Sequence, residues 1–264
     1  MLLPSTSALF QKAGMLAADG RCKTLDSLAD GYVRSEFCGL VLLSPFPPHD
    51  SLESSNALRA IRGNLKADCV WADQTLGILV GTAVNQDGRS SSLTAPSGPA
   101  QQGVIAAALA AGSVDAHQVG CIQLHGTGTS LGDPVEIDAA STALMLGSRG
   151  SGEDAPTGDP LSLQAGKSRM GHAEPAAGIA GLLGALGSLG SALLQPILHL
   201  RSINAHVTAA LQQHRSGMAA ASGAARQQAP ARQSDSVSLA GCSAFAFQAS
   251  ILYQYLCLHT ESLL

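Results

Sequence analysis

The chain has 264 residues, of which 45% are hydrophobic, 13% charged and only 3% aromatic. This composition is typical of a globular protein with a sizeable core and excludes an intrinsically disordered chain. The formal net charge of −4 and the scarcity of aromatic side chains argue against nucleic-acid binding, which needs basic patches or stacking surfaces.

Neither the first nine residues nor the most apolar stretch predicts a signal peptide or a membrane segment. Met1–Leu9 lacks the basic residues that begin a signal peptide. Ala176–Leu194 carries no charge and approaches the ~18 residues that can span a bilayer. Its glycines recur every third residue, a density that suits close helix packing in a membrane or in a large protein core. Because the chain has no further apolar span, we favour a buried core helix and expect no membrane association. We expect a cytoplasmic protein, with a plastid as the alternative.

Strand and helix patterns alternate through the middle of the chain. Leu76–Val84 is a short apolar run that ends in a turn, which predicts a buried strand. A helix is predicted over 98–111, with Ser97 as its N-cap, a proline in its first turn and a glycine at its end. Val119–Leu124 is predicted as the next strand and places His125 at its carboxyl end. Such alternation favours an α/β architecture.

Two acidic residues, Asp133 and Glu136, stand at the predicted start of the following helix. Asp133 can accept from exposed amides and Glu136 can reach back to the cap, so both are interpreted as helix-cap residues. After a polar loop over 149–159, Leu161–Gln164 is predicted as a short strand that leads to Lys167. The Gly/Ala-rich helix follows and is expected to stop near a proline.

The last part of the chain changes character. Ile197–Leu200 is predicted to be extended. Ala205–Ser238 is rich in Ala, Gln, Ser and Arg and has no apolar periodicity, which predicts a flexible insert or linker. Leu239–Leu258 is apolar again and is expected to supply the last strands.

The cysteines are scattered and none forms a Cys-x-x-Cys pair. Their apolar surroundings favour buried free thiols in a reducing compartment over disulfides. No group of Cys and His has the spacing of a zinc site, so we predict no bound metal. The six are Cys22, Cys38, Cys69, Cys121, Cys242 and Cys257.

Two glycine-rich segments each contain a histidine beside small hydroxyl residues, where backbone can approach a substrate closely. They read His125-Gly126-Thr127-Gly128-Thr129-Ser130-Leu131-Gly132-Asp133-Pro134 and Gly166-Lys167-Ser168-Arg169-Met170-Gly171-His172-Ala173-Glu174. Together they resemble the two histidine motifs of β-ketoacyl synthases, the condensing enzymes of fatty-acid and polyketide synthesis.

Three further segments in the same order extend the resemblance over roughly residues 10–204, with a weak echo at 239–250. A lone His-Gly-Thr-Gly motif is weak evidence, but five ordered segments are specific. The further segments are Gly20–Asp26 with Ala29–Arg34, Ala83–Ser90 with Leu93–Pro96, and His199–Asn204.

The resemblance implies a thiolase-like α/β fold built from two related halves. We expect mainly the C-terminal half, with a mixed sheet and the buried Gly/Ala-rich helix. The chain is divided accordingly into a remnant of the N-terminal half (1–75), the C-terminal half with both histidine motifs (76–204), a low-complexity insert or linker (205–238) and degenerate last strands (239–264).

The resemblance also implies a reaction. In this family a cysteine takes an acyl chain from a carrier-protein thioester, and the carbanion left when a malonyl thioester loses carbon dioxide attacks that acyl group. His125 and His172 would donate hydrogen bonds to the thioester oxygen on which charge develops. Imidazole suits this task because it presents an N–H without a permanent charge. Lys167 would orient the site and tune its electrostatics.

The substrate arm would be held by small polar groups. By resemblance, Thr127 and Thr129 would bind the phosphopantetheine arm of an acyl carrier protein, and Glu174 would support that region through a polar network. Both threonines can instead satisfy the turn with local hydrogen bonds, and Lys167 can be an ordinary solvated lysine. The remaining histidines are interpreted as surface or packing residues; among them are His49, His117, His206, His214 and His259.

Several departures from the family pattern stand out. The family nucleophile lies upstream of both histidines, and no cysteine here has its small-residue, serine-rich setting. Ser35-Glu36-Phe37 replaces an expected Gly-Glu-Gly, Gln123 replaces a glutamate, and Ser243–Ile251 replaces a glycine-rich Phe-Gly-Phe segment that ends in Thr-Asn. These departures indicate a truncated, mis-spliced or decayed domain.

Two hypotheses of different classes follow. The first is a β-ketoacyl synthase-like acyltransferase fragment that binds no cofactor of its own and cannot condense two acyl units alone. The second is a non-catalytic partner that binds acyl carrier protein or pairs with a complete ketosynthase. Because the family is typically dimeric and a half-fold exposes apolar surface, we expect either a homodimer or a complex with a complete ketosynthase. Decarboxylation without condensation is an intermediate outcome.

Overall fold

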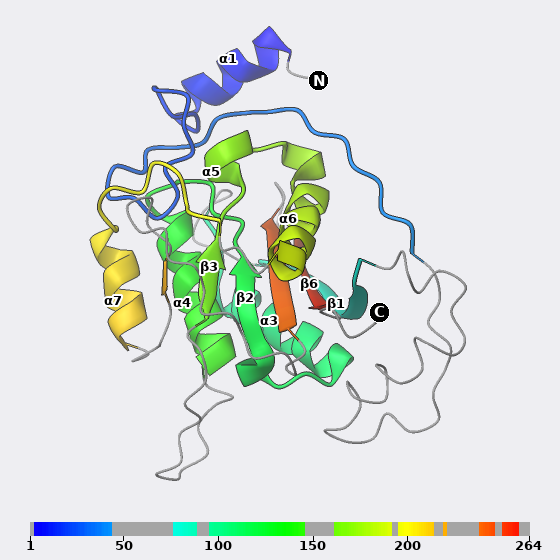
Figure 1. Ribbon diagram of the computed structural model, residues 1–264. Helices are drawn as coiled ribbons and strands as arrows, with labels where there is room; N and C mark the ends of the chain where they lie inside the picture. The colour runs from blue at the N-terminus through cyan, green and yellow to red at the C-terminus, as the bar shows by residue number, and fades with distance from the viewer. Residues whose placement is uncertain are drawn as a thin grey trace.

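The computed structural model describes residues 3–43, 76–88, 95–145, 161–191, 195–213, 219–220, 238–245 and 250–258. Within these residues, helices pack on both faces of one mixed sheet (Figure 1). The strands are β1 (Ile78–Gln86), β2 (Val119–Gln123), β3 (Ser162–Gln164), β4 (Ala219–Ala220), β5 (Ser238–Phe245) and β6 (Ser250–Leu258). The helices are α1 (Pro4–Lys12), α3 (Gly98–Gly112), α4 (Gly132–Met145), α5 (Lys167–Met170), α6 (Ala177–Ser191) and α7 (Ala205–Gln213), with the short 3-10 helices η2 (Ala116–Gln118) and η4 (Glu174–Ala176).

The order of strands brings the two histidine motifs together. The strands lie in the order β1-β6-β5-β2-β3-β4. β2 is parallel to β3 and β5, whereas β6 is antiparallel to β1 and β5. Gln123 at the end of β2 pairs with Gln164 at the end of β3. The segments that begin at His125 and Ala165 therefore leave the same edge of the sheet side by side.

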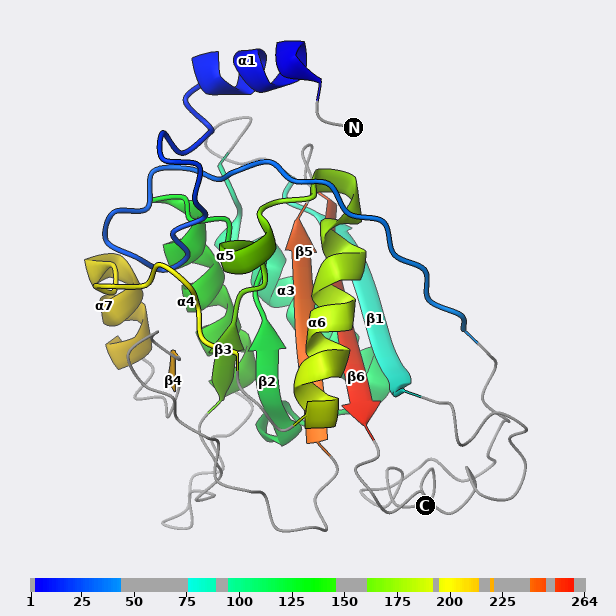
Figure 2. The same cartoon turned by 45° about the horizontal axis from the view of Figure 1, so that its top comes forward.

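Alternate residues of the central strands face two different helical layers. Ile122 of β2 and Leu239 of β5 belong to the larger core, which α3, α4 and α7 cover. Cys121 and Ala240, their neighbours along the chain, belong to a smaller cluster with the buried face of α6. The helix α6 thus lies on the face of the sheet opposite α3 and α4 (Figure 2).

The helix α6 is the predicted Gly/Ala-rich core helix, and its glycines explain how closely it lies on the sheet. A Cβ built on Gly181 would lie 2.7 Å from Cys242 Sγ, and one built on Gly184 would overlap the Gln123 side chain. A larger residue at Gly181 would push the helix away from β5, whereas one at Gly184 would displace the Gln123 side chain. Among the described residues, no helix combines the length and apolar character needed to cross a membrane.

Most local predictions in the middle of the chain are confirmed. The predicted strands correspond to β1, β2 and β3, and the last apolar stretch forms β5 and β6. β1 is not the buried strand that we predicted: it stands at one end of the described strand order, only its Gly81 is buried, and Val84 is 66% exposed. The predicted N-cap of α3 is present, since Ser97 Oγ accepts from the Ala100 amide at 3.3 Å. The predicted glycine cap is wrong by one residue: Gly112 is the last helical residue, and Ser113 ends the helix in the left-handed region.

Two predictions near the end of the described chain are wrong. Ile197–Leu200 is not extended but contains a turn, with His199 at a φ of 66°. The predicted linker does not begin at Ala205, because 205–213 forms α7 against α4. Val207 and Ala210 are buried in that contact, so packing stabilises a helix that the Ala- and Gln-rich composition concealed. The rest of the predicted insert lies outside the described residues, apart from β4 and the first residue of β5.

The N-terminal segment crosses the edge of the sheet where β2 and β3 end (Figure 2). Gly31 donates to the Gly128 carbonyl at 3.0 Å, and Thr24 Oγ1 donates to the Gly126 carbonyl at 2.6 Å. Residues 24–31 therefore lie directly against the first histidine loop and help to fix its shape.

Candidate active site

The loop that carries His125 is held by the carboxylate of Glu136. Glu136 Oε1 accepts from the His125 amide at 2.7 Å, and Oε2 accepts from the Gly126 amide at 2.8 Å. Ser243 Oγ donates to the same Oε1 at 2.6 Å. The carboxylate thus binds the loop after β2 to the strand β5.

The carboxylate of Asp133 holds the other end of this loop. Its Oδ1 accepts from the Gly128 amide at 3.1 Å and its Oδ2 from the Leu25 amide at 2.8 Å. Burial, the largest influence, raises the pKa of Asp133 to about 7. The interpretation of Asp133 and Glu136 as helix-cap residues is therefore wrong: both carboxylates accept from backbone outside their own helix.

The ring of His125 is buried and is oriented by Phe245, the last residue of β5. The Phe245 amide donates to His125 Nδ1 at 3.1 Å, and the Phe245 ring lies 4.7 Å from the imidazole, centroid to centroid. A nitrogen that accepts a hydrogen bond carries no proton. In the neutral ring of His125 the proton is therefore on Nε2.

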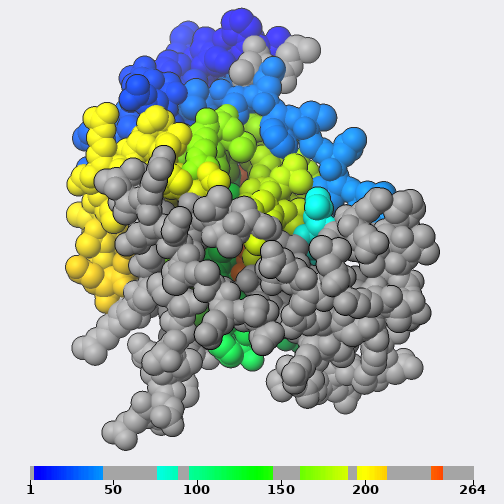
Figure 3. All heavy atoms as spheres, in the orientation of Figure 1, coloured from blue at the N-terminus to red at the C-terminus, as the bar shows by residue number. Residues whose placement is uncertain are grey.

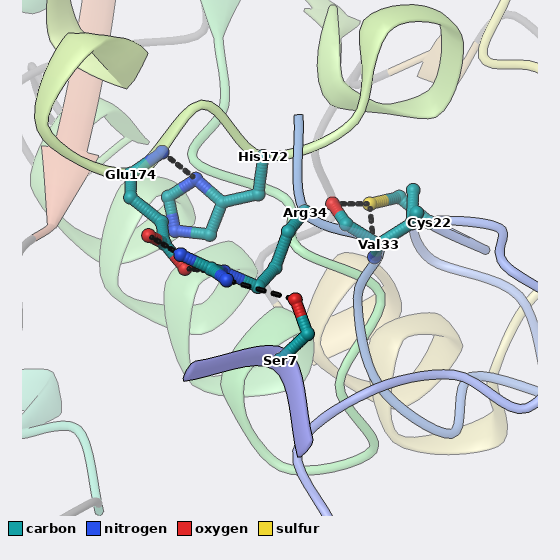
Figure 4. A network of polar contacts seen from close by, with 6 residues as sticks. All are labelled: Ser7, Cys22, Val33, Arg34, His172 and Glu174. Atoms are coloured by element: carbon teal, nitrogen blue, oxygen red, sulfur yellow. Dashed lines mark hydrogen bonds and ion pairs between the residues drawn. The ribbon is translucent and has the colours of Figure 1, made fainter. Parts of the chain in front are cut away.

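His172 follows α5 and is oriented in the same way. The Glu174 amide donates to His172 Nδ1 at 3.2 Å (Figure 4). The backbone of His172 pairs with the N-terminal segment, since its amide donates to the Val33 carbonyl at 2.7 Å and its carbonyl accepts from Ser35 at 3.0 Å. Its neutral ring also carries the proton on Nε2.

The two imidazoles lie next to each other and both are neutral near pH 7. Their ring centroids are 5.1 Å apart and the planes are perpendicular. Burial, with a smaller effect of Lys167, lowers the pKa of His172 to about 4 and holds that of His125 well below its ordinary value. The arrangement offers two neutral N–H donors close together.

Lys167 lies at the start of α5 and is also buried, with a relative exposure of 7%. Burial lowers the pKa of its ammonium group, while the carboxylate of Glu136 acts in the opposite direction. Lys167 and Gln123 line one small cavity between β2, α5 and α6, and Gln123 Oε1 has no hydrogen-bond partner there among the described residues. The structure thus brings together His125, His172 and Lys167, and the interpretation of Lys167 as a solvated lysine is wrong.

The two threonines lie in the first histidine loop and are half-buried. Thr127 Oγ1 and Thr129 Oγ1 are 3.5 Å apart, and Thr129 Oγ1 accepts from the Gly132 amide at 3.2 Å. Thr129 therefore makes the local turn hydrogen bond that we considered as the alternative. Contact of either threonine with a substrate stays a prediction.

Glu174 binds Arg34, an arginine that lies outside both histidine motifs. Its carboxylate accepts from Arg34 Nε at 2.7 Å and from Nη2 at 2.9 Å (Figure 4). The pair is 140 residues apart in sequence, so no local pattern links the two side chains. The only signal for Arg34 was its place in one of the segments that carry the family resemblance.

The described cysteines are mostly buried. Cys22 Sγ accepts from the Val33 amide at 3.3 Å, and burial raises the pKa of this thiol. Burial also raises the pKa of Cys242 to about 12. Cys121 is buried, whereas Cys38 is exposed and is not the buried thiol that we expected. Cys69 and the side chain of Cys257 lie outside the described residues, and within the described part no group of His, Cys, Asp and Glu could hold a metal.

Comparison with known proteins agrees with this geometry. The family model "Beta-ketoacyl synthase, C-terminal domain" matches residues 76–201, and "Beta-ketoacyl synthase, N-terminal domain" matches residues 1–47. The chain is 37% identical to a phenolphthiocerol/phthiocerol polyketide synthase protein of Mycobacterium tuberculosis, over 68% of this chain and 7% of that protein. It is 40% identical to the spectinabilin polyketide synthase system protein NorB of Streptomyces orinoci, over 77% of this chain and 8% of that protein.

Solved structures share the fold. A ketosynthase domain of oxazolomycin synthesis from Streptomyces albus JA3453 superposes with a TM-score of 0.72 at 27% identity, over 98% of this chain and 40% of the other. The ketosynthase from module 6 of the bacillaene synthase of Bacillus subtilis 168 gives a TM-score of 0.71 at 22% identity, which shows the fold alone. The chain thus spans less than a tenth of the polyketide synthases named above and less than half of these ketosynthase chains.

The architecture defines a thiolase-like α/β protein, as predicted. More narrowly, the chain belongs to the β-ketoacyl synthase family, and it corresponds to part of a ketosynthase domain of the polyketide synthase type. The family is one of condensing transferases, and the resemblance drawn from the two histidine motifs is confirmed.

Proposed function

We propose that this chain supplies the malonyl-thioester side of a ketosynthase site in polyketide synthesis. The Nε2–H groups of His125 and His172 donate to one thioester oxygen and so promote decarboxylation. The observation that carries this proposal is the matched pair of amide contacts to the two Nδ1 atoms, which leaves both neutral rings protonated on Nε2.

Decarboxylation of the malonyl thioester requires hydrogen-bond donors at the thioester oxygen, where negative charge develops. When the carboxylate leaves as carbon dioxide, its bonding electron pair moves onto the α-carbon and is shared with the thioester oxygen. Two pre-oriented N–H donors stabilise that oxygen, and loss of one such donor costs about 10²–10³ in rate. The buried ammonium of Lys167 adds positive potential and keeps the rings neutral.

The substrate arrives on a carrier. The proposal includes an acyl carrier protein as partner, with its phosphopantetheine arm against Thr127 and Thr129. We propose that the reaction takes place in the cytoplasm or in a plastid. Condensation also needs a thiolate to hold the acyl group. No cysteine of the sequence has the small-residue, serine-rich setting of the family nucleophile, and burial raises the pKa values of Cys22 and Cys242. We therefore propose that the isolated chain decarboxylates but does not condense.

The test uses malonyl-carrier protein labelled in its free carboxyl group. We expect release of labelled carbon dioxide, and we expect His125→Gln and His172→Gln to lose about 10²-fold or more of the rate. His206→Gln, at an exposed position on α7, is the matched control and keeps the rate. A folded wild-type chain that releases no carbon dioxide overturns the decarboxylation proposal.

A second labelled substrate tests the missing step. Acyl-carrier protein labelled in its acyl chain should leave the protein unlabelled after denaturing separation. A stable thioester on any cysteine of the chain contradicts the proposal that it cannot condense.

One surface feature favours a second candidate, a non-catalytic partner of a complete ketosynthase. The extended segment 36–43 pairs with none of the described strands and lies on the surface beside α6 (Figure 3). Gly39 and Val41 face α6, whereas Leu40 and Leu42 are 94% and 96% exposed. An apolar extended edge of this kind invites pairing with another chain.

Sedimentation distinguishes the two candidates. The partner hypothesis predicts that the chain binds a complete ketosynthase domain and that the double variant Leu40→Lys, Leu42→Lys abolishes binding. A well-folded monomer without affinity for that domain removes this candidate and leaves the decarboxylation proposal intact.

A further inference from the structure

We propose that Arg34 is a positioning residue for His172: through its ion pair with Glu174 it holds the Glu174 amide against His172 Nδ1 and keeps the proton of the ring on Nε2. The consequence for catalysis rests on the proposed function, whereas the tautomer of His172 is a property of the folded chain.

The contact to be held in place is a backbone hydrogen bond over two residues. Glu174 N donates to His172 Nδ1 at 3.2 Å. To reach back in this way, Glu174 adopts a φ of 49°, in the left-handed region that non-glycine residues rarely occupy. Such a conformation persists only where surrounding contacts fix it.

Arg34 supplies that contact in a geometry that leaves little freedom. Its Nε and Nη2 donate to the two oxygens of the Glu174 carboxylate at 2.7 and 2.9 Å, a bidentate pair that fixes the plane of both groups. The Arg34 side chain is only 7% exposed and that of Glu174 is 24% exposed, so solvent reaches the pair mainly from the Glu174 side. The same contact holds the pKa of Glu174 below its ordinary value and keeps the carboxylate ionised.

The guanidinium of Arg34 is itself anchored by α1. Nη1 donates to Ser7 Oγ at 2.9 Å, and the guanidinium carbon lies 5.1 Å from the centroid of the Phe10 ring. Figure 4 shows the guanidinium between the Ser7 hydroxyl and the Glu174 carboxylate, with the His172 ring on the far side of Glu174. The helix α1 therefore supports His172 without touching the ring.

The backbone adds a second point of attachment. Arg34 and His172 form an isolated parallel β-bridge, in which both neighbours of Arg34 bond to the His172 backbone. The position of the His172 Cα is thus set by the N-terminal segment, and the direction of its ring is set by the Glu174 amide. Without that amide, the neutral ring can move its proton to Nδ1 and present a bare nitrogen on the side where an N–H is needed.

Nitrogen NMR on the whole chain tests the tautomer directly. With ¹⁵N-labelled histidine, we expect His172 in wild type to show a bare Nδ1 and a protonated Nε2, and His172→Gln assigns its signals. Arg34→Gln should give averaged signals for both nitrogens of His172 while those of His125 stay unchanged, which also reports that the site is folded. Arg21→Gln, in an exposed arginine of the same segment, is the matched control. A single unchanged tautomer in Arg34→Gln overturns the proposal.

Titration supplies a readout that a merely structural role would not move. The groups that face the His172 ring are the ammonium of Lys167, the carboxylate of Glu174 with its partner Arg34, and the rings of Tyr32 and His125. Arg34→Gln leaves the carboxylate without its counter-charge, so the pKa of His172 rises; Glu174→Gln removes the carboxylate, so that pKa falls. Shifts in the same direction contradict the proposal.

A conservative variant separates charge from geometry. Arg34→Lys keeps the positive charge but loses the bidentate contact with the Glu174 carboxylate. We therefore expect a pKa of His172 near that of wild type, together with averaged tautomer signals. Wild-type signals in Arg34→Lys for both pKa and tautomer would show that charge alone suffices, and the positioning proposal would fail.

The carbon dioxide assay keeps the two proposals apart. If wild type is active, Arg34→Gln should lower kcat about tenfold or more with little change in KM, since it affects a donor used in the transition state. If wild type is inactive, the proposed function fails while the NMR outcomes still decide the role of Arg34. An active Arg34→Gln with wild-type kcat overturns the positioning role.

Discussion

The carboxylate of Glu136 binds the backbone of His125, with Oε1 2.7 Å from the amide nitrogen of the histidine. Oε2 accepts from the Gly126 amide, and Ser243 Oγ donates to Oε1, so both oxygens of this buried carboxylate have hydrogen-bond partners. The shape of the loop after β2 therefore depends on one carboxylate that lies 11 residues further along the chain.

Glu136→Gln should lower the free energy of unfolding by about 2–4 kcal/mol. The amide has one acceptor oxygen instead of two, and its NH₂ group faces a backbone N–H that then loses its partner. Urea denaturation measures the change. Asp30→Asn, at an exposed carboxylate whose known partner is Lys23, is the control and should change stability by less than about 1 kcal/mol. Equal losses in the two variants would contradict the role given to Glu136.

Lys167→Met should make the chain more stable and inactive. Burial lowers the pKa of Lys167, so the charged ammonium costs free energy in the folded state, and an apolar side chain of similar length should raise stability by about 1–2 kcal/mol. Lys23→Met is the control of opposite sign, because Lys23 is paired with Asp19 and Asp30 and its loss should slightly destabilise the chain. The pKa values of His125 and His172 should both rise in Lys167→Met, which NMR titration can follow. A less stable Lys167→Met variant contradicts this account.

The sequence was sufficient where local pattern and strand direction carry the information. Apolar runs and caps were enough to locate β1, α3, β2 and β3. His125 follows β2 and Lys167 follows β3, so the two residues lie close together if these strands are parallel neighbours. The family resemblance was specific because it depended on ordered motifs and not on composition.

The remainder of the site depends on contacts between distant residues. A carboxylate in the first turn of a helix fits a cap as well as a loop anchor, so Glu136 and Asp133 were assigned to the wrong partners. The contacts of Arg34 with Glu174 and of Phe245 with His125 join residues 140 and 120 positions apart, which one sequence cannot reveal. The helix α7 escaped prediction because its apolar face is short and its stability comes from packing on α4.

His172 should make folding stability fall as the pH falls below 6.5. Its pKa is about 4 in the folded chain and 6.5 as the ordinary value, so between these limits the unfolded state binds the proton and the folded state does not. The contribution of His172 to folding stability is thus fully present above pH 6.5 and is lost as the pH falls to about 4. In His172→Gln the slope of unfolding free energy against pH should be smaller by about 1.2 kcal/mol per pH unit near pH 5.

The comparison of slopes contains its own control. Asp133, with a pKa raised to about 7, acts in the opposite direction over this range, but it is present in both chains and cancels in the difference. Near pH 8, neither the folded nor the unfolded state protonates His172, so the two slopes should coincide there. Equal slopes near pH 5 would mean that His172 is not buried in its neutral form.

Gly128→Ala should cost much more stability than Gly20→Ala, although both glycines have positive φ. A Cβ on Gly20, at a φ of 66°, meets nothing within 4 Å, so only backbone strain of about 1 kcal/mol is expected. A Cβ on Gly128, at a φ of 80°, would lie 2.6 Å from the backbone nitrogen of Lys23. The N-terminal segment must then move away from the histidine loop, which should cost at least about 2 kcal/mol more in urea denaturation.

Because the same segment carries Arg34, Gly128→Ala should also average the His172 tautomers, whereas Gly20→Ala should leave them unchanged. Equal effects of the two substitutions would show that the segment does not need its close contact with the loop.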